Sequence, residues 1–319
     1  MENLKDVEFL ARQTGLKPAQ AEGLIYLFLG PPISNQDLLI TTGLSKSILD
    51  NFRARIGGYL LPPSGKTALN EEGQRWAKRI APQPFSWQPQ SFGEIPEKLS
   101  QVLSRFNERR LRADRKLDQF RATKETVWRR VALMSREGDL KNRRLLFLGD
   151  SDWTCLAAAV AGQAKRIFVV DADRRVISDL EMVSREEGFR VELLKYDLAR
   201  PLPAHLVNNF DVVFSDPPYT YNGVGLFLSR SIEAVEKERS SRIYFCYGQS
   251  DRAGERTLAI QALVNQLGLL IEQRLPKFNR YFGAASIGSS SSLYINSLTA
   301  KTKPSLTGKF LGSIYTWQR

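Results

Sequence analysis

Carboxylate side chains end four short apolar runs in the middle of the chain. Each run has the length and composition of a buried parallel strand, and the carboxyl ends of parallel strands meet at one edge of an open α/β sheet. Carboxylates gathered there can bind hydroxyl, amino or ammonium groups and can accept protons. The residues concerned are Asp150 and Asp152 after the first run, Asp171 after the second, Asp197 after the third and Asp216 after the fourth.

The second and third runs predict a nucleoside site. Asp171 lies about 20 residues beyond Gly149, the spacing at which a strand-end carboxylate accepts hydrogen bonds from ribose hydroxyls. Capping of the next helix is the alternative role for an acid in this place, and Asp173 is the better candidate for it. Asp197, at the end of the third run, would then face the amino group of adenine. We therefore expect the sheet to bind an S-adenosyl compound.

Asp216-Pro217-Pro218-Tyr219 is the most specific local pattern. The two prolines stiffen the loop, so that the aspartate and the carbonyl before it point to one place, which the tyrosine ring covers. Carboxylate and carbonyl oxygens can accept the N–H bonds of an amine there, orient its lone pair and help to remove its proton. A proline-rich turn without a chemical role is the alternative, and the apolar strand before the loop argues against it.

The loop after the first run is unusual for a methyltransferase. Such an enzyme uses a glycine-rich turn whose N–H groups bind the carboxylate of S-adenosylmethionine, but here Gly149 is followed by Asp150, Ser151 and Asp152. Two aspartates would repel that carboxylate. They would instead favour decarboxylated S-adenosylmethionine, which ends in a bare amine, or a polycationic substrate.

Length and composition indicate a soluble chain of about two domains, because its 319 residues are 42% hydrophobic and 25% charged. No apolar run approaches the ~18 residues that span a bilayer, and the N-terminus lacks the profile of a signal peptide. We therefore expect a cytoplasmic protein without a membrane partner. Cys155 and Cys246 are far apart and have no metal ligands nearby, and His205 is the one histidine, so we expect neither a disulfide nor a metal.

The net charge of +12 is unevenly distributed. The basic excess lies in residues 1–144 and 299–319, whereas residues 145–298, which contain the four runs, are close to neutral. A basic flank can bind the phosphates of a nucleic acid, but solvated helix faces have the same composition. We favour the second interpretation.

Residues 1–80 predict a small winged-helix-like domain. Gly30-Pro31-Pro32 would stop its first long helix. Lys46 is the one basic residue of the expected recognition helix before Arg53, so a nucleic-acid partner is not favoured. The expected elements are helices over 18–29 and from 34, a helix-turn-helix pattern over 42–49, two extended pieces over 57–69 and a closing helix over 70–79.

The rest of the chain predicts a linker, a sheet domain and a tail. Residues 81–116 are expected to form a linker and a helix. Residues 117–300 are expected to form the Rossmann-like catalytic domain, with a closing antiparallel pair over 276–282 and 291–295. Residues 301–319 form a basic tail that we expect to be loosely held. The predicted fold class is therefore α/β, with a Rossmann-like sheet of class I methyltransferase type behind the winged-helix-like domain.

Together these motifs resemble those of a known family, the branched-chain polyamine synthases or bis(aminopropyl)spermidine synthases of thermophiles. Those enzymes combine a small winged-helix-like N-terminal domain with a Rossmann-like catalytic domain that carries a Gly-Asp-Asp-Asp loop and an Asp-Pro-Pro motif. The resemblance extends from about Leu117 to Ile295, and before it the agreement is architectural only. Its residues are Asp118-Gln119, Thr123, Arg129-Arg130, Gly149-Asp150-Ser151-Asp152, Asp171, Asp197, Asp216-Pro217-Pro218 and Phe278-Asn279-Arg280-Tyr281.

The resemblance implies transfer of aminopropyl groups from decarboxylated S-adenosylmethionine to the secondary amine of spermidine, with release of methylthioadenosine, by a homodimer. The family's catalytic aspartate corresponds to Asp152, and Ser151 stands where the family has another aspartate, which leaves the number of additions and the acceptor open. The expected site residues are the catalytic Asp152 and Asp216, the cofactor-binding Gly149, Asp150, Asp171 and Asp197, and the substrate-binding Pro217, Pro218, Tyr219 and Tyr281.

Two other classes of function fit parts of the pattern. An S-adenosylmethionine-dependent amino-methyltransferase acting on DNA or RNA would use the Asp216 loop for a base amine and the basic flank for phosphates, but Asp150 and Asp152 argue against it. A transcription regulator would bind DNA through the winged helix and sense a metabolite with the sheet. Such a regulator would bind duplex DNA in a salt-sensitive way and form no product.

Overall fold

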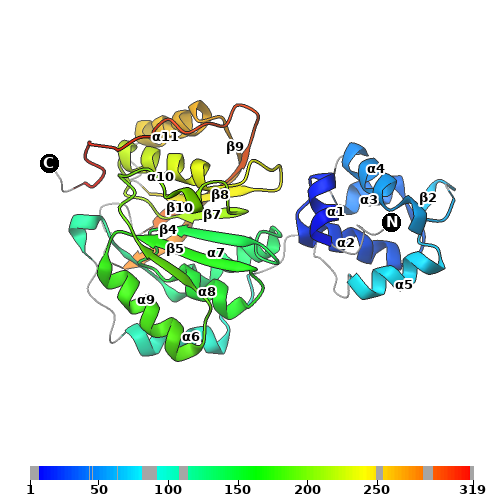
Figure 1. The fold of residues 1–319 in the computed structure, drawn as a ribbon, viewed down its shortest axis with the longest axis horizontal. Helices are drawn as coiled ribbons and strands as arrows, with labels where there is room; N and C mark the ends of the chain where they lie inside the picture. The colour runs from blue at the N-terminus through cyan, green and yellow to red at the C-terminus, as the bar shows by residue number, and fades with distance from the viewer. Residues whose placement is uncertain are drawn as a thin grey trace. The chain divides into compact units, whose positions relative to one another are not determined.

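The computed structural model divides the chain into two compact units (Figure 1). The first unit consists of residues 1–92 and 135–141, and the second of residues 93–134 and 142–319. The structure describes residues 7–42, 44, 46–62, 64–80, 92–107, 114–248, 254–282 and 290–316.

The first unit consists of short helices around one apolar core and a small antiparallel sheet. Helix α2 starts at Pro18, where a proline needs no hydrogen-bond partner, and it ends before Gly30. Phe28, Phe52 and Trp76 are buried in the core. The elements are α1 (Val7–Thr14), α2 (Pro18–Leu29), β1 (Ile33–Ser34), α3 (Asn35–Thr42), α4 (Lys46–Arg55), η2 (Gly57–Tyr59), β2 (Lys66–Thr67), which pairs with β1, and α5 (Glu71–Ile80).

A segment from later in the chain completes the first unit. Lys17 Nζ lies 2.8 Å from Asp139 Oδ2, and both side chains are almost fully buried. Glu22 on α2 forms a second ion pair with Lys141, at 2.5 Å. Residues 135–141 are thus held at the start of α2 by charge pairs, one of which is shielded from water.

The second unit contains an eight-stranded sheet in the order β3-β9-β10-β8-β7-β4-β5-β6. Five neighbouring strands, from β8 to β6, are parallel, and β10, β9 and β3 add antiparallel pairs at the other side. The predicted α/β fold with a mostly parallel sheet is therefore confirmed. The strands are β3 (Arg121–Ala122), β4 (Arg144–Leu148), β5 (Arg166–Asp171), β6 (Glu192–Lys195), β7 (Val212–Ser215), β8 (Arg242–Tyr247), β9 (Leu269–Phe282) and β10 (Ser290–Leu298).

Helices cover both faces of this sheet (Figure 1). Helices α10 and α11 pack on one face, where α10 contacts β4, β7 and β8, and α8 and α9 pack on β5 and β6 from the other. The strand order reverses between β4 and β7, which is the place where open α/β sheets bind ligands. The helices are α6 (Glu97–Asn107), η3 (Arg115–Leu117), α7 (Lys124–Arg136), α8 (Thr154–Ala161), α9 (Arg174–Glu187), η4 (Ala204–Leu206), α10 (Tyr221–Ala234) and α11 (Gly254–Gln266).

The expected closing antiparallel pair is confirmed, but β9 starts at Leu269, seven residues before the predicted strand at 276. Side chains in this added part alternate between buried or half-buried and exposed positions, as one face of a strand requires. In the part of the chain that the structure describes, no helix is long and apolar enough to cross a bilayer.

The expectation of a loosely held tail is wrong for residues 301–316. Arg230 on α10 is fully buried, and its guanidinium donates hydrogen bonds to the carbonyl oxygens of Leu306 at 3.1 Å and Gly308 at 2.7 Å. Thr220 Oγ1 donates to the carbonyl of Ile314 at 2.7 Å. Because a buried guanidinium needs acceptors, α10 fixes the tail through backbone oxygens, which the tail's composition does not reveal.

Glycine 268 offers a test of how tightly the tail is packed. An alanine Cβ at Gly268 would lie 2.5 Å from the carbonyl carbon of Lys301, and φ is +72°; Gly188 has a similar φ of +69° but open space around it. We expect Gly188→Ala to lower the free energy of unfolding by about 1–2 kcal/mol through backbone strain alone. Gly268→Ala should lower it by about 2–5 kcal/mol, since a clash is added. Urea unfolding measures both, and equal losses would contradict the packing.

Candidate functional site

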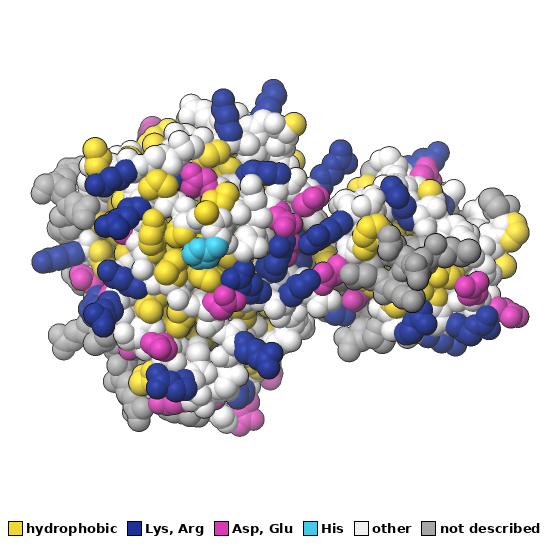
Figure 2. Space-filling view, viewed as in Figure 1, with side chains coloured by type: hydrophobic (Ala, Val, Ile, Leu, Met, Phe, Trp, Pro, Cys, Tyr) yellow, Lys and Arg dark blue, Asp and Glu magenta, His cyan; other side chains and the backbone are white. Residues whose placement is uncertain are grey.

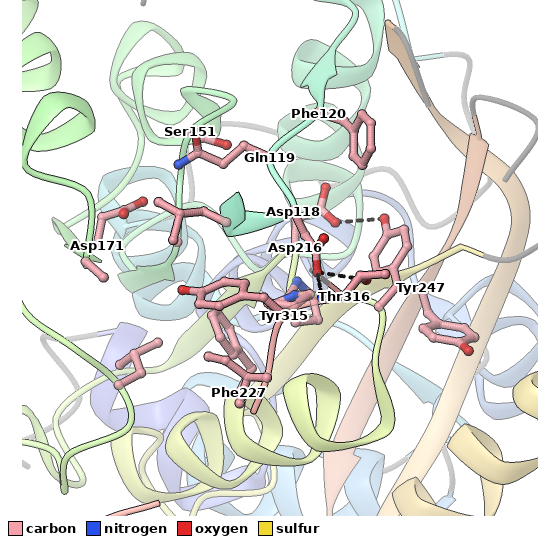
Figure 3. Close-up of a pocket in the computed structure, with 18 of the residues that line it drawn as sticks. Asp118, Gln119, Phe120, Ser151, Asp171, Asp216, Phe227, Tyr247, Tyr315 and Thr316 are labelled. Carbon is pink, nitrogen blue, oxygen red and sulfur yellow. Dashed lines mark hydrogen bonds between the residues drawn. The ribbon is translucent and has the colours of Figure 1, made fainter. Parts of the chain in front are cut away.

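A cavity of about 360 Å³ opens in the second unit at the carboxyl ends of β4, β5, β7 and β8 (Figure 3). Its described wall combines carboxylates, aromatic rings and backbone from distant parts of the chain. Of the residues expected to form the site, those that line it are Gly149, Asp171, Asp197, Asp216, Pro217, Pro218, Tyr219 and Tyr281. Asp150 and Asp152 are not among the described lining residues.

Asp171 lies at the end of β5, where backbone groups fix its orientation. Its Oδ2 accepts a hydrogen bond from the backbone N–H of Asp150 at 3.1 Å, and its Oδ1 accepts one from Asp173 N–H at 2.8 Å. Burial raises the pKa of Asp171 to about 6, although these bonds oppose the rise. Asp173 caps α9 by accepting from Arg175 N–H at 2.9 Å, as expected. The side-chain cap of α9 thus comes from Asp173, and Asp171 lines the cavity (Figure 3).

The side chain of Asp150 has a structural role at the start of α8. Its two oxygens accept hydrogen bonds from Thr154 N–H and Cys155 N–H, both at 2.8 Å, at the start of α8. Its side chain is buried, and burial raises its pKa to about 7. The expected contact of Asp150 with a cofactor stays a prediction, and the structure gives this carboxylate the role of an anchor for the loop that carries Gly149.

Arg130 on α7 joins the two carboxylates that we expected to be catalytic. It is fully buried, its Nη1 lies 3.0 Å from Asp152 Oδ2, and its Nη2 lies 2.6 Å from Asp216 Oδ2. Arg130 Nε also donates to Asn279 Oδ1 at 2.8 Å. One guanidinium between two carboxylates leaves a negative charge when both acids are ionised, so this cluster favours a cation in the cavity.

Asp216 is the member of this cluster that lines the cavity, and its side chain is 16% exposed. Tyr219 OH donates to its Oδ1 at 2.8 Å, and Tyr281 OH donates to its Oδ2 at 2.7 Å. Burial raises the pKa of Asp216, while Arg130 and the two tyrosines lower it again in part. Because burial also raises the pKa of both tyrosines well above the usual value, their hydroxyls keep their protons and remain donors.

Asp152 lies beside the cavity and is 4% exposed. Its Oδ1 accepts a hydrogen bond from Ala122 N–H at 2.7 Å, and its Oδ2 is held by Arg130. The structure thus brings Asp152 and Asp216 together through one guanidinium. The catalytic role of Asp152 stays a prediction, and in this arrangement it would act on Asp216 through Arg130.

The sequence motifs do not assign Arg130 to the site, although the sequence contains a signal for it. Val127, Val131 and Met134 form the buried face of α7 at helical spacing, and Arg130 lies within this face. A charged residue on an apolar stripe predicts a buried ion pair. Other lining residues that were missed are Asp118, Gln119, Phe120, Tyr247, Arg256, Tyr315 and Thr316.

The cavity is acidic overall. The carboxylates of its described wall are Asp118, Asp171, Asp197 and Asp216, and Arg256 is the one cationic side chain that lines the same described surface. Aromatic rings, whose faces attract cations, also line the cavity. Among the described residues there is no group of three or more metal-binding side chains. Figure 2 shows Lys and Arg spread over the visible face of both units, so the acidic lining contrasts with the many cationic side chains on that face.

Comparison with known proteins matches this chain to one family. The family model of the branched-chain polyamine synthase A C-terminal domain matches residues 98–308. An N(4)-bis(aminopropyl)spermidine synthase of Thermococcus kodakarensis is 33% identical over 213 residues, which are 65% of this chain and 59% of that protein. An uncharacterized protein of Methanocaldococcus jannaschii is 42% identical over 183 residues, which are 57% and 46% of the two chains. The chain thus spans about half the length of these relatives.

Among solved structures, the branched-chain polyamine synthase of Thermus thermophilus superimposes with a TM-score of 0.62 over 98% of this chain and 91% of its own. The two sequences are 24% identical, so the likeness shows a shared fold. That crystal structure contains N4-aminopropylspermidine and 5′-methylthioadenosine.

The carboxyl group of Asp150 should make stability depend on pH. Its pKa of about 7 in the folded chain exceeds the ordinary 3.8, so between these values the folded chain holds a proton that the unfolded chain releases. The free energy of unfolding therefore falls as pH rises from about 4 to about 7. Asp150→Asn removes this titration. The denaturant midpoint of the variant, relative to that of the wild type, should therefore rise as pH increases from about 4 to about 7. A constant difference between the two would contradict the assignment.

Replacement of Arg130 should cost far more stability than replacement of its neighbour. Arg130→Met leaves Asp152 and Asp216 buried without a counter-ion, so we expect a loss of about 3–5 kcal/mol in the free energy of unfolding. Arg129→Met is the matched control, because the Arg129 guanidinium lies over the Phe278 ring at 4.5 Å and is only partly buried. It should cost at most about 1 kcal/mol in chemical unfolding. Similar losses would refute the central role of Arg130.

Proposed function

Because the chain belongs to the branched-chain polyamine synthase family, we propose that it transfers aminopropyl groups from decarboxylated S-adenosylmethionine to the secondary amine of spermidine. The observation that carries this proposal is the cavity at the strand ends, where Asp216 lies between Arg130 and two tyrosine hydroxyls. The crystal structure of the T. thermophilus enzyme contains N4-aminopropylspermidine and 5′-methylthioadenosine, which are the products expected from one such transfer, and this supports the proposal.

The donor would lie with its nucleoside on the β4–β6 side of the cavity. Asp171, held by two backbone N–H groups, is the proposed ligand of the ribose hydroxyls, and Asp197 is the proposed partner of the adenine amino group. Gly149 has a φ of +70°, and its lack of a side chain lets the loop backbone approach the ligand. The acidic lining supports a donor that ends in an amine, because a methionine carboxylate would be repelled there.

The acceptor amine would lie against Asp216. An amine of spermidine is protonated in neutral water, so a proton must leave before the nitrogen attacks the methylene carbon next to the sulfonium. The new C–N bond forms as the C–S bond breaks, and the electron pair leaves with methylthioadenosine. Asp216 is the proposed acceptor of the proton, since it is the carboxylate of the Arg130 cluster that reaches the cavity. Asp152 would hold Arg130 in place and set the charge felt by Asp216.

We also propose that the first unit is winged-helix-like over residues 1–80. Helices α3 and α4 followed by the strand β2, which pairs with β1, support this interpretation. Residues 81–116 would be the linker with its helix, 117–300 the catalytic domain of class I methyltransferase type and 301–319 the tail. A homodimer and a cytoplasmic location stay predictions.

Product analysis tests the proposed activity. The purified protein is incubated with spermidine and decarboxylated S-adenosylmethionine, and the amines are weighed by mass spectrometry. The expected products are spermidine with one and then two aminopropyl groups on its central nitrogen, together with methylthioadenosine. A parallel reaction with S-adenosylmethionine and DNA or RNA tests the methyltransferase alternative. Methylated nucleic acid without any aminopropylated amine would refute the proposal.

The two aspartates of the Arg130 cluster should both be needed for turnover. We expect Asp216→Asn and Asp152→Ala each to lower kcat more than ~100-fold, the usual effect of losing an acid–base group or its support. Glu181→Gln, on the exposed surface of α9, is the control and should keep the wild-type rate. Near-normal transfer by either aspartate variant would show that its carboxylate has no part in the chemistry.

A further inference from the structure

Asp118 is a cavity carboxylate that the proposed chemistry does not use. It lies between the short helix η3 and strand β3 and lines the cavity next to Gln119 and Phe120 (Figure 3). Its Oδ2 accepts hydrogen bonds from Thr316 N–H at 2.7 Å and Thr316 Oγ1 at 3.0 Å. Its Oδ1 receives no hydrogen bond from the residues that the structure describes. The carboxylate is therefore fixed by one oxygen and leaves the other for a ligand.

The surroundings of Asp118 leave its charge unbalanced. Asp216 is paired with Arg130, and Asp171 is held by two backbone N–H groups, but among the described ion pairs none includes Asp118. Burial raises the pKa of Asp118, and the bonds from Thr316 only partly offset the effect. Burial of a charged carboxylate without a counter-ion raises the free energy of the folded protein. A cation from a ligand would lower it again.

The rest of the wall suits an alkylammonium group. The rings of Phe120 and Tyr315 line the cavity together with Asp118. Burial first, then the charges of Asp171, Asp197 and Asp118, raise the pKa of Tyr315 to about 12, so its hydroxyl stays neutral near these acids. Aromatic faces and a carboxylate together bind ammonium groups that carry an alkyl chain. Asp118 also has a φ of +51°, an uncommon conformation for a residue other than glycine.

We propose that Asp118 forms a separate subsite for a primary alkylammonium group. The inference rests on the proposed function, in which two substrates carry such a group. Decarboxylated S-adenosylmethionine has one at the end of its aminopropyl arm, and spermidine has one at each end. Methylthioadenosine, which shares the nucleoside of the donor, has none. Asp118 would hold the ammonium end of one substrate while the reacting amine lies at Asp216, so the two carboxylates would position a single chain or two converging ones.

The test is Asp118→Asn, studied by calorimetry with each ligand alone. The amide oxygen can still accept from Thr316, so the variant removes the charge and keeps the contact with the tail. Loss of a charged hydrogen bond should raise the Kd of the substrate that uses the subsite about ten- to a hundredfold. If spermidine is affected, the subsite holds the acceptor; if decarboxylated S-adenosylmethionine is affected, it holds the donor. The Kd of methylthioadenosine should change less than about threefold.

The matched control is Asp114→Asn, an aspartate of the same loop that pairs with Arg175 and is not among the described cavity residues. It should leave all three Kd values as they are in the wild type. Unchanged binding of both amines to Asp118→Asn would overturn the proposal, and so would a weakening of methylthioadenosine equal to that of the amines. These measurements need no turnover, so they decide the subsite even if the product analysis were to refute aminopropyl transfer.

Discussion

The ion pairs of Arg130 are the interaction on which the site depends. A guanidinium without contact to water must be neutralised where it lies, and here Asp152 and Asp216 meet that need at 3.0 Å and 2.6 Å. Separate elements of the second unit therefore converge on a single side chain of α7. The other groups that hydrogen-bond to it are Thr154 Oγ1, Cys246 Sγ, Asn279 Oδ1 and Tyr281 OH.

The same cluster determines the electrostatic environment of Asp216 in the cavity. Burial raises the pKa of Asp216, whereas Arg130 and the hydroxyls of Tyr281 and Tyr219 lower it in part. The balance gives a carboxylate whose affinity for a proton is raised but which is still stabilised when it is charged. A carboxylate with a raised pKa that still receives hydrogen bonds and a counter-ion is suited to exchange a proton with an amine.

The sequence predicted those parts of the site that follow from strand pattern. Asp171, Asp197 and Asp216 line the cavity because apolar runs mark parallel strands, and parallel strands end at one edge. Asp150 was assigned to a ligand, but its oxygens bind N–H groups of α8, a choice that depends on local geometry and not on residue type. The central place of Arg130 does not follow from the sequence, because its partners Asp152 and Asp216 come from segments far away in the chain.

The C-terminal tail could not be placed from its own residues, because it is held by its carbonyl groups and by Arg230 on α10. Its position has a consequence for biosynthesis. Ile314, Tyr315 and Thr316 form part of the cavity wall, and a ribosome makes them after every other element of that wall. Until residues 314–316 have been made and have docked, the pocket therefore lacks this part of its wall.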